Sequence, residues 1–467
     1  MKKLKVIDLA KASKARLFGD SKAIIENIVI DSRDTKPGSM FVCIVGEVND
    51  GHKFVESAYK NGTRVFLMSD MNAVTTLMQN HEDATVIFVQ DTQQAFKEMA
   101  EWYLSLLNVK KVGVTGSVGK TTTKSLVAEV LSAKYKTVCS QKNYNTHLGL
   151  YMTTFLADMD TEMIVYEMGM DKKGEIDEYC SWVKPDAGII TIVGDSHLEK
   201  LGSKEAIADA KLEITHYMDE NCTLIYNCDS PFLDMPSLEA RTKMNFALVP
   251  VGTGKDASVK VSDVISRGLK GIAFDLTLKD EYMHIDLPLL GTHNAGNAAL
   301  AAACGILFDV PTAAICKALA SATGTDRRLS FEEINTMLLL DDSYNANPAS
   351  MAAALEVLAR IRAKRHVAVL GDMYELGADE EEGHIQTGAK AGELGVNLLV
   401  AIGKNACLYA EGAMTKSSSI SIIKFPDVDR ASERIMDLIG PGDAILVKGS
   451  NSTKVSKIAE MIRNLKN

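Results

Sequence analysis

One stretch of the sequence combines glycines, hydroxyl side chains and a lysine in the order that phosphate binding requires. Residues 114–122 read Val-Thr-Gly-Ser-Val-Gly-Lys-Thr-Thr, and they follow an apolar strand predicted at 112–115 and open a helix predicted at 120–133. Backbone N–H groups of such a turn and the positive end of the following helix face a bound polyphosphate. Lys120 is expected to reach the outer phosphates, and the Thr121 hydroxyl is expected to bind magnesium.

This loop departs from the strict P-loop at one position. A strict P-loop has glycine six residues before the lysine, where this chain has Val114; Gly113, Gly116 and Gly119 are present instead. The alternative interpretation is a tight turn that carries Gly-Lys-Thr by chance. The strand before the loop and the amphipathic run 126–131 after it supply the context of a variant P-loop.

Further polar side chains follow strands predicted in the same region. Glu167 closes an apolar strand, His197 follows another after a short turn, and Lys211 lies on a helix predicted at 204–217. Ligands of parallel α/β sheets bind beyond the carboxyl ends of the strands. A carboxylate placed there is a natural ligand for magnesium, which prefers oxygen donors. On residue type alone, His197 is interpreted as a hydrogen-bonding loop residue and Lys211 as a solvated helix lysine.

Other polar residues leave two interpretations open. Arg33, beside a predicted strand end, either grips a phosphate or carboxylate or forms a surface salt bridge. Asn294 fits the N-cap of a small-residue helix predicted at 295–308, and this function leaves Asn297 unexplained. Both amides could equally read a purine edge. The P-loop edge of the sheet is also expected to carry three residues that follow a predicted strand: Asn143, Asn145 and Thr146.

The elements that must position these residues alternate between strand and helix. Such alternation predicts a mostly parallel sheet with helices on both faces. After the P-loop, strands are predicted at 137–140, 163–167, 187–193 and 223–227, followed by antiparallel strands at 271–278 and 283–289. The fold class is therefore α/β, with a P-loop domain at its centre.

A second strand–helix alternation follows a polar segment near 322–328, which indicates a linker. Pro348 is expected to begin a helix that runs to residue 361, since proline is favoured in the first turn. Strands are predicted at 337–341, 366–370, 398–402, 420–425 and 444–447. This Rossmann-like domain has no second P-loop, so we expect it to act as a lid or a co-substrate module.

Length and composition limit the class of protein. A chain of 467 residues is too long for one ordinary core, so two or three domains are expected. The formal charge of −10 argues against a general nucleic-acid or membrane-surface binder. Eight scattered cysteines without a Cys-x-x-Cys pair indicate reduced thiols of a cytoplasmic protein. The sequence shows neither a signal-peptide core nor an apolar run long enough to span a bilayer.

Five groups of motifs carry a resemblance that extends over essentially the whole chain. They are Asp31-Ser-Arg33 with Pro37-Gly38 and Asp50-Gly-His52; residues 114–122; Glu167-Met-Gly169 with Gly174-Glu-Ile176; residues 291–297; and residues 341–348 with 370–377 and His384. In these motifs the chain resembles the Mur ligases, whose P-loop has the same displaced glycine. The Asp-Ser-Tyr-Asn-Ala-Asn-Pro segment resembles the branch that adds D-alanyl-D-alanine.

The resemblance implies an ATP-dependent amide ligase of peptidoglycan precursor synthesis. ATP phosphorylates the terminal carboxylate of a UDP-linked muramoyl tripeptide, and the amine of D-alanyl-D-alanine attacks the acyl phosphate, which releases phosphate. Catalysis is then mostly positioning and charge neutralisation around the moving phosphoryl group. Mg²⁺ is the implied cofactor, with Thr121, Glu167 and His197 as its ligands, and carbamylation of Lys211 is implied as well.

Residue roles carried over by the resemblance fall into three sets. The implied catalytic residues are Lys120, Glu167, His197, Lys211, Asp342 and His384. The implied ATP contacts are Thr115, Gly116, Ser117, Gly119, Lys120, Thr121, Thr122, Asn294, Asn297, Asp342 and one of Arg327 and Arg328. The implied substrate contacts are Asp31, Ser32, Arg33, Asn143, Asn145, Thr146, Tyr344, Asn345 and Asn347.

Some positions depart from the family pattern, so other functions are considered as alternatives. Leu212 follows the lysine where glycine is usual, Leu150-Tyr151 stands where proline is common, and Asn451 follows Lys-Gly-Ser where arginine is common. A family member with a different carboxylate and amine is one alternative. A nucleotide-binding protein without ligase activity is another, and a general P-loop ATPase or kinase is a weaker one.

We expect three domains and a soluble enzyme. The expected bounds are 1–108 for a UDP-substrate domain, 109–324 for the ATP-binding domain and 325–467 for the Rossmann-like domain. The expected partners are small molecules, without nucleic acid or membrane insertion, and the expected oligomeric state is a monomer. Which third residue the accepted peptide carries is left open by the sequence.

Overall fold

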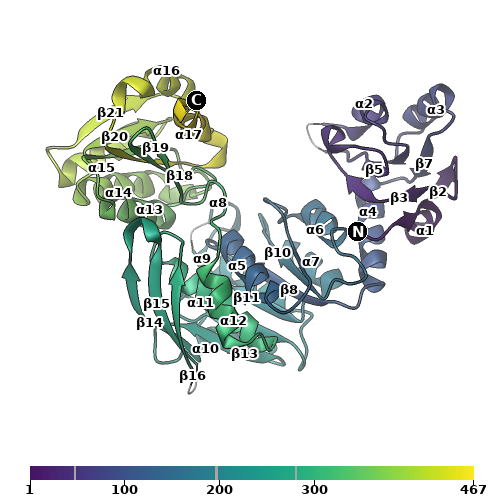
Figure 1. The fold of residues 1–467 in the computed structure, drawn as a ribbon, viewed down its shortest axis with the longest axis horizontal. Helices are drawn as coiled ribbons and strands as arrows, with labels where there is room; N and C mark the ends of the chain where they lie inside the picture. Colours follow the sequence, from purple (N-terminus) through teal and green to yellow (C-terminus); the bar gives the residue numbers. More distant parts are fainter. Residues whose placement is uncertain (47–48, 195–197, 279–280, 467) are drawn as a thin grey trace. The chain divides into compact units, whose positions relative to one another are not determined.

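The computed structural model describes residues 1–46, 49–194, 198–278 and 281–466. Their helices and strands are drawn in Figure 1. The chain divides into two compact units. Unit 1 comprises Met1–Gly113, Lys134–Met170 and Asp177–Asp186. Unit 2 comprises Val114–Ala133, Asp171–Ile176 and Ala187–Asn467. Two elements are divided between the units along the chain: strand β8 (Lys110–Thr115) and helix α7 (Glu175–Val183).

Unit 1 begins with a five-stranded sheet of order β2-β7-β6-β5-β4, in which only the β2–β7 pair is antiparallel. Its strands are β2 (Arg16–Phe18), β4 (Asn27–Val29), β5 (Ser39–Val42), β6 (Val65–Met68) and β7 (Thr85–Phe88). Helices α1 (Val6–Ala12) and α4 (Thr92–Ser105) pack on one face, and α2 (Val55–Lys60) and α3 (Met71–Asn80) pack on the other. Short strands β1 (Leu4–Lys5) and β3 (Ile24–Ile25) pair separately.

The rest of unit 1 contains a parallel strand pair and the helix that connects its strands. Strand β9 (Thr137–Cys139) leads through α6 (His147–Thr154) to β10 (Met163–Glu167). Tyr151 and Phe155, at the end of α6, pack in the same core cluster as α4. Phe96 of α4 stacks on Phe155 with ring centroids 5.7 Å apart.

The first part of unit 2 carries strands in the order β16-β15-β14-β13-β12-β11. Pairing is parallel from β11 to β14 and antiparallel from β14 to β16. The strands are β11 (Ala187–Ile190), β12 (Thr223–Asn227), β13 (Ala247–Gly252), β14 (Val259–Ser266), β15 (Ile272–Leu278) and β16 (Glu281–Leu287). The helices are α5 (Lys120–Ser132), α8 (Leu198–Leu201), α9 (Lys204–Leu212), α10 (Met235–Arg241), α11 (Asn294–Leu307) and α12 (Thr312–Ala320). The alanine-rich α11 packs closely against α5, which starts at the P-loop.

The second part of unit 2 is a six-stranded sheet of order β17-β18-β22-β19-β20-β21. Its strands are β17 (Ser330–Ile334), β18 (Met337–Asp342), β19 (Arg365–Gly371), β20 (Leu398–Ile402), β21 (Ser421–Phe425) and β22 (Asp443–Lys448). Only β17 runs antiparallel to its neighbour. Helices α13 (Pro348–Arg360), α14 (Glu380–Glu393) and α15 (Ala406–Lys416) cover one face, and α16 (Val428–Leu438) and α17 (Ser456–Arg463) cover the other.

Alternating side chains explain why this last sheet takes helices on both faces. Val367 and Val369 of β19 belong to the core under α16 and α17, whereas Ala368 and Leu370 belong to the core under α13, α14 and α15. A strand buried on both sides must be apolar at every position. The run His-Val-Ala-Val-Leu therefore predicts a central strand of a parallel sheet.

The predicted α/β fold class is confirmed, and several elements have the expected bounds. Strands 163–167, 223–227 and 398–402 match β10, β12 and β20. The helix predicted at 204–217 is wrong in length, because α9 ends at Leu212 and a 3₁₀ turn follows it. Strands β13 and β17 and helix α12 were not predicted. No helix that the structure describes combines the length and the apolar character needed to cross a membrane.

Candidate active site

The P-loop turn owes its shape to two glycines with positive φ. Gly116 has φ of 145° and Gly119 has φ of 88°, and Gly119 is the N-cap residue of α5. A Cβ atom on Gly116 would meet Oγ1 of Thr191 at 1.9 Å, and one on Gly119 would meet Oδ1 of Asn297 at 2.6 Å. Both positions therefore require glycine, and the strand–turn–helix context expected for a P-loop is present.

The segment after β11 holds the loop in place through hydrogen bonds. Thr191 Oγ1 donates to the Val118 carbonyl at 2.6 Å. Ser117 N–H donates to the Ile192 carbonyl at 2.7 Å, and Gly194 N–H donates to Ser117 Oγ at 2.9 Å. The chain's own contacts thus set the loop shape, as preorganised binding requires. Thr191 was not singled out from the sequence. Its contact with the P-loop joins residues 73 apart in sequence, and only the fold brings them together.

The lysine and the threonines of the P-loop lie at the turn itself and at the start of α5. Lys120 Nζ donates to the carbonyls of Gly116 at 2.6 Å and Ser117 at 3.3 Å, so the ammonium lies over the loop. Thr121 is buried in the first turn of α5, and Thr122 is half-buried beside it. Thr115 Oγ1, at the end of β8, is fully buried and has no hydrogen-bond partner among the described residues.

Lys211 is buried, so its interpretation as a solvated helix lysine is wrong. It lies on α9 with only 1% of its surface exposed, and among the described residues no hydrogen bond or ion pair to its ammonium is formed. Burial, and then the nearby charge of Lys120, lower the pKa of the Lys211 ammonium well below its usual range. Burial in such a setting favours the neutral amine, which is the nucleophilic form of lysine, over the ammonium.

Asn294 and Asn297 support the loop from the side of α11. Asn294 is the first residue of α11 instead of its N-cap, and its Nδ2 donates to the Leu290 carbonyl at 2.8 Å, so the N-cap prediction is wrong. Asn297 Nδ2 donates to Asn294 Oδ1 at 2.8 Å, and its Oδ1 accepts from Thr123 Oγ1 at 3.2 Å. Asn297, which capping left unexplained, therefore joins α11 to the first turn of α5.

In the second part of unit 2, Asp342 binds a lysine side chain and a backbone N–H group. Its Oδ2 lies 2.6 Å from Nζ of Lys448, which is 2% exposed and also donates to the Asn345 carbonyl at 2.9 Å. Its Oδ1 accepts from Leu329 N–H at 3.1 Å. Asp342 ends β18 and Lys448 ends β22, two neighbouring strands. The pair thus joins two strand ends that are 106 residues apart in sequence.

The two candidate arginines have different surroundings. Arg327 donates to Ser343 Oγ at 3.2 Å, to the Ser343 carbonyl at 2.8 Å and to Asn451 Oδ1 at 3.1 Å. Arg328 lies over the ring of Tyr344, 4.1 Å from its centroid. Both residues thus gather beside Tyr344, and Arg327 is the one fixed by hydrogen bonds.

His384 is buried and fully hydrogen-bonded. Its Nδ1 donates to the Glu380 carbonyl at 2.6 Å, so Nε2 accepts from Met373 N–H at 3.0 Å. Burial lowers the pKa of this imidazole, which agrees with a neutral ring. Asp372, next to Met373 in sequence, is also buried and accepts from the N–H groups of Lys404 and Asn405. His384 and Asp372 thus fix the loop after β19.

The Asp-Ser-Tyr-Asn-Ala-Asn-Pro segment forms the connection from β18 to α13. Asn347 is the N-cap of α13, with its Oδ1 accepting from Ser350 N–H at 2.9 Å, and Pro348 occupies the first turn as predicted. Asn345 Oδ1 accepts from Ala346 N–H at 2.9 Å. This asparagine thus stabilises the turn, and the Lys448 ammonium binds its carbonyl.

In unit 1, the predicted substrate residues lie in two segments. Arg33 forms a bidentate ion pair with Asp31, with Nη2 2.5 Å from Oδ2, and both side chains are solvent-accessible. These hydrogen bonds lower the pKa of Asp31 to about 2. Ser32 is buried, and its carbonyl accepts from Thr35 Oγ1 and Asn61 Nδ2. Arg33 thus forms a surface salt bridge with Asp31 in this structure, and its expected contact with the substrate stays a prediction.

Glu167 and Asn145 come together at the carboxyl end of β10. Glu167 is buried, and Asn145 Nδ2 donates to its Oε1 at 3.4 Å. Asn145 N–H donates to the Asn143 carbonyl at 2.7 Å, and Thr146 is the N-cap residue of α6. Burial and the negative charges of Asp34 and Asp31 raise the pKa of Tyr144. This tyrosine, which the motifs did not single out, therefore belongs to the surroundings of Asp31.

His197, the remaining predicted metal ligand, lies outside the described residues. Within the described ranges, no group of three or more histidine, cysteine or acidic side chains is arranged to hold a metal ion. Magnesium in nucleotide sites is usually held by one or two protein oxygens together with phosphates and waters. The buried Thr121 hydroxyl next to the P-loop is a donor of the kind that magnesium requires.

Comparison with known proteins agrees with the fold and these motifs. Three domain models match: "Mur ligase family, catalytic domain" over residues 24–109, "Mur ligase middle domain" over 114–305 and "Mur ligase, glutamate ligase domain" over 327–451. The UDP-N-acetylmuramoyl-tripeptide–D-alanyl-D-alanine ligase of Bacillus subtilis is 34% identical over 94% of this chain and 93% of its own. The enzyme of the same name from Escherichia coli is 32% identical over 94% of each chain.

Solved structures show the same similarity. The crystal structure of MurF from Acinetobacter baumannii matches with a TM-score of 0.85 and 28% identity, covering 99% of both chains. The MurF ligase of Thermotoga maritima in complex with ADP matches in fold with a TM-score of 0.76 at 24% identity, over 94% of this chain and 98% of that one. The chain belongs to the Mur ligase family. It is accordingly an α/β ligase with three Mur ligase domains.

Proposed function

We propose that this protein joins D-alanyl-D-alanine to UDP-N-acetylmuramoyl-tripeptide, with conversion of ATP to ADP and phosphate, in peptidoglycan precursor synthesis. One observation carries the proposal: the preorganised P-loop, the buried Lys211 and Asn297 all belong to unit 2. The relatives that carry this name share about a third of the sequence over nearly the full length.

ATP supplies the driving force by activating a carboxylate. The terminal carboxylate of the tripeptide attacks the γ-phosphorus, ADP leaves, and an acyl phosphate forms. The amine of D-alanyl-D-alanine then attacks the acyl carbon, phosphate leaves with the C–O electron pair, and the nitrogen loses a proton. Lys120 and the loop N–H groups hold the phosphates and neutralise charge that builds up on them, which is the principal contribution of a protein to phosphoryl transfer.

The metal belongs to the same proposal. Mg²⁺, when bound, would neutralise phosphate charge and orient the phosphoryl group. Thr121 and Glu167 are its proposed ligands, with His197 at a second magnesium position. Both described residues are buried and carry oxygen donors, so they fit an oxygen-preferring ion.

Lys211 is proposed to be carbamylated. Its neutral amine attacks the carbon of CO₂ and loses a proton, which leaves a carbamate anion. Burial supports this step, because it lowers the pKa of the ammonium and so favours the unprotonated amine that attacks CO₂. The resulting negative charge would be attracted to the nearby Lys120 ammonium, whose charge disfavours the protonated form of Lys211.

Residues of the second part of unit 2 complete the proposed ATP and substrate contacts. Asp342 and one of Arg327 and Arg328 are proposed to contact ATP. Tyr344, Asn345 and Asn347 are proposed to line the site on closure. His384 was expected to be catalytic. Because both ring nitrogens are bonded within the fold, we propose that it acts by positioning the loop after β19.

Residues of unit 1 are proposed to bind the UDP-linked substrate. Asp31, Ser32 and Arg33 form one part of that contact, and Asn143, Asn145 and Thr146 form the other. The proposed domain bounds are 1–108, 109–324 and 325–467. The proposed enzyme acts in the cytoplasm as a monomer on small molecules.

The test is a phosphate-release assay with ATP, Mg²⁺, UDP-N-acetylmuramoyl-tripeptide and D-alanyl-D-alanine, in which one component is left out at a time. The expected result is release that needs both substrates, with the pentapeptide product identified by mass spectrometry. Release that ignores D-alanyl-D-alanine would overturn the assigned amine. In that case a panel of other amines would identify a family member with a different substrate pair.

A further inference from the structure

Arg463, at the end of helix α17, joins the antiparallel strands β17 and β18. Its Nη2 donates to Asp341 Oδ2 at 2.7 Å, and its Nε donates to Oε1 of Glu332. Asp341 lies on β18 and is fully buried, whereas Glu332 lies on β17 and is partly exposed. The donors of a guanidinium are fixed in one plane, so a single arginine can hold two carboxylates in a set geometry. Helix α17 thus fixes the end of β18.

The other carboxylate oxygen of Asp341 binds Ser343. Asp341 Oδ1 accepts from Ser343 N–H at 3.0 Å and from Ser343 Oγ at 2.5 Å. Ser343 is itself buried, and hydrogen bonds to a carboxylate are short and strong. Because the hydroxyl hydrogen points to Asp341, the lone pairs of Ser343 Oγ are left to accept from another donor.

Arg327, in the segment before β17, is that donor. Its Nε donates to Ser343 Oγ at 3.2 Å, and its Nη2 donates to the Ser343 carbonyl at 2.8 Å and to Asn451 Oδ1 at 3.1 Å. The Arg327 carbonyl accepts from Tyr344 N–H at 3.2 Å. Arg327 has φ of 58°, a left-handed conformation that a residue other than glycine keeps only where surrounding contacts impose it. These contacts therefore set the course of the chain at residue 327.

Arg328, the next residue, has different surroundings. Its guanidinium lies 4.1 Å from the centroid of the Tyr344 ring, and among the described residues no hydrogen bond or ion pair to this side chain is formed. Arg327 would have to break its bonds to Ser343 in order to bind a phosphate, whereas Arg328 has its donors available.

We infer that Arg463, Asp341 and Ser343 are positioning residues of the nucleotide site. They hold Arg327, and Arg327 in turn fixes the backbone from which Arg328 contacts ATP. The inference rests on the proposed function in one respect, which is that an arginine of this segment binds the nucleotide. It gives helix α17 a function in nucleotide binding, through a continuous series of hydrogen bonds.

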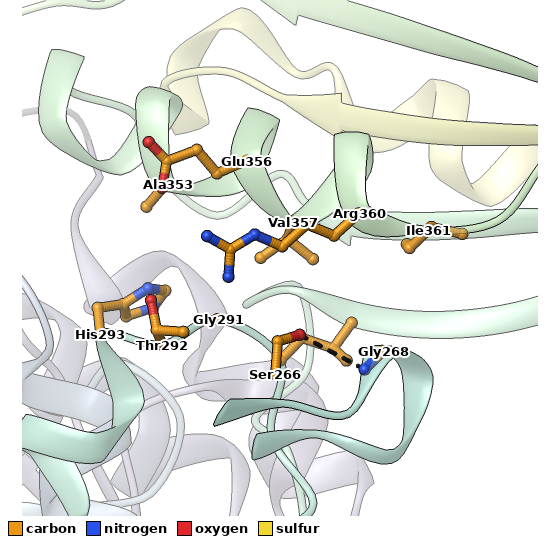
Figure 2. Close-up of a pocket in the computed structure, with 11 residues that line it drawn as sticks. Ser266, Gly268, Gly291, Thr292, His293, Ala353, Glu356, Val357, Arg360 and Ile361 are labelled. Carbon is orange, nitrogen blue, oxygen red and sulfur yellow. Dashed lines mark hydrogen bonds between the residues drawn. The ribbon is translucent and has the colours of Figure 1, made fainter. Parts of the chain in front are cut away.

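The cavity drawn in Figure 2 is separate from this series of contacts. The cavity has a volume of about 90 Å³ and is lined by the end of β14, the segment before α11 and helix α13. Arg463, Asp341, Ser343 and Arg327 are not among its described lining residues. Substitutions in the series therefore leave the lining of this cavity unchanged.

Ser343→Ala in the full-length protein is the principal test. It removes the hydroxyl between Asp341 and Arg327 and leaves the ion pair of Asp341 with Arg463 in place. Calorimetry measures the binding of β,γ-imidoadenosine triphosphate with Mg²⁺. We expect about fivefold weaker binding in Ser343→Ala and in Arg463→Lys, which corresponds to the loss of one hydrogen bond. Unchanged binding in both variants overturns the inference.

Arg434→Lys is the matched control for Arg463→Lys. Arg434 lies on the neighbouring helix α16 and pairs with Asp437 at the surface. We expect this substitution to change nucleotide affinity by less than about twofold, because an exposed ion pair contributes little. A loss in the control equal to that in Arg463→Lys would overturn the assignment to Arg463.

A double-mutant cycle with Arg328 separates positioning from general destabilisation. In an Arg328→Ala background, Ser343→Ala should weaken binding by less than about twofold further, because the side chain that it positions is gone. A merely structural role would give the same loss in both backgrounds and would overturn the inference, as would an Arg328→Ala variant with unaltered affinity. The assay contains no peptide or dipeptide, so it does not depend on which carboxylate and amine are joined. Absence of nucleotide binding by the wild type would overturn the proposed function itself.

Discussion

Nζ of Lys448 lies 2.6 Å from Oδ2 of Asp342, and the two side chains are 2% and 13% exposed. The pair joins the carboxyl ends of β22 and β18, where the proposed nucleotide contacts of this part of the chain lie. A buried ion pair is worth little compared with an apolar pair, but the loss of one partner leaves a charge without compensation.

Asp342→Asn is therefore expected to loosen the β18 and β22 strand ends. In this variant the buried Lys448 ammonium keeps the Asn345 carbonyl but loses its counter-charge. We expect the free energy of local opening to fall by about 3 kcal/mol, which makes amide exchange roughly a hundredfold faster. Hydrogen–deuterium exchange with mass spectrometry of peptides from both strands measures this. Glu433→Gln, which breaks the exposed pair with Arg430, is the control and should change protection by less than about 0.5 kcal/mol. Equal exchange in wild type and Asp342→Asn would contradict the prediction.

Gly116→Ala is expected to abolish tight nucleotide binding. The new Cβ atom cannot coexist with Thr191 Oγ1, and the backbone there has φ of 145°. We expect ADP affinity, measured by calorimetry, to fall at least about 100-fold, or roughly 2.8 kcal/mol. Gly440→Ala is the matched control, since a Cβ atom on Gly440 meets no atom within 4 Å. Unaltered ADP binding by Gly116→Ala would show that the loop relaxes or is not the nucleotide site.

The free energy of unfolding should increase with pH because of the lowered pKa of Lys211. Its pKa in the folded chain is well below the usual 10.5, so between these two values the unfolded chain binds a proton that the folded chain does not. Stability then rises with pH across that window, by up to about 1.4 kcal/mol per pH unit. Melting temperatures between pH 7 and 9 in CO₂-free buffer measure this.

Two variants separate this effect from other titrations. Lys211→Met should remove the rise in melting temperature with pH, whereas Lys200→Met, at a half-exposed lysine, should retain it. A rise of the same size in Lys211→Met would mean that other groups cause it. With ¹³C-labelled bicarbonate present, a carbamate resonance should appear in the wild type and be absent from Lys211→Met.

His384 should remain neutral through the physiological range. Its folded pKa is lowered by burial, so the stability that its neutral ring gives is complete above about pH 6.5, the ordinary value, and decreases as pH falls below it. NMR titration of the His384 Cε1 proton, assigned with a His384→Ala variant, should show no midpoint at or above pH 6.5. Such a midpoint would mean that Nε2 is free to accept a proton and does not accept from Met373.

Local patterns were sufficient to predict the P-loop and most of the elements around it. Alternation of apolar strands with amphipathic helices depends on neighbours in the chain, so β10 and β12 were predicted with their observed bounds. Gly116 and Gly119 could be read as turn residues for the same reason. The requirement for glycine itself comes from Thr191 and Asn297, which reach the loop from distant segments.

Tertiary contacts decided what the sequence could not predict. Lys211 has an ordinary helical context, and only the fold buries it. Lys448 and Asp342 are 106 residues apart, so no spacing rule connects them. Asn294 was expected to cap α11, but its amide instead bonds the Leu290 carbonyl, which belongs to the preceding turn. Each of these residues contacts a segment whose position depends on the whole sheet.

In the sheet order β17-β18-β22-β19-β20-β21, strand β22 lies between β18 and β19, which both come earlier in the sequence. Both β18 and β19 form their inner ladders with β22. During synthesis, the strands before residue 443 can therefore form only two separate fragments, β17-β18 and β19-β20-β21. Each fragment has an unpaired, apolar edge where β22 will pair. Such edges are prone to pair wrongly, so the six-stranded sheet can reach its native order only after β22 has been synthesised.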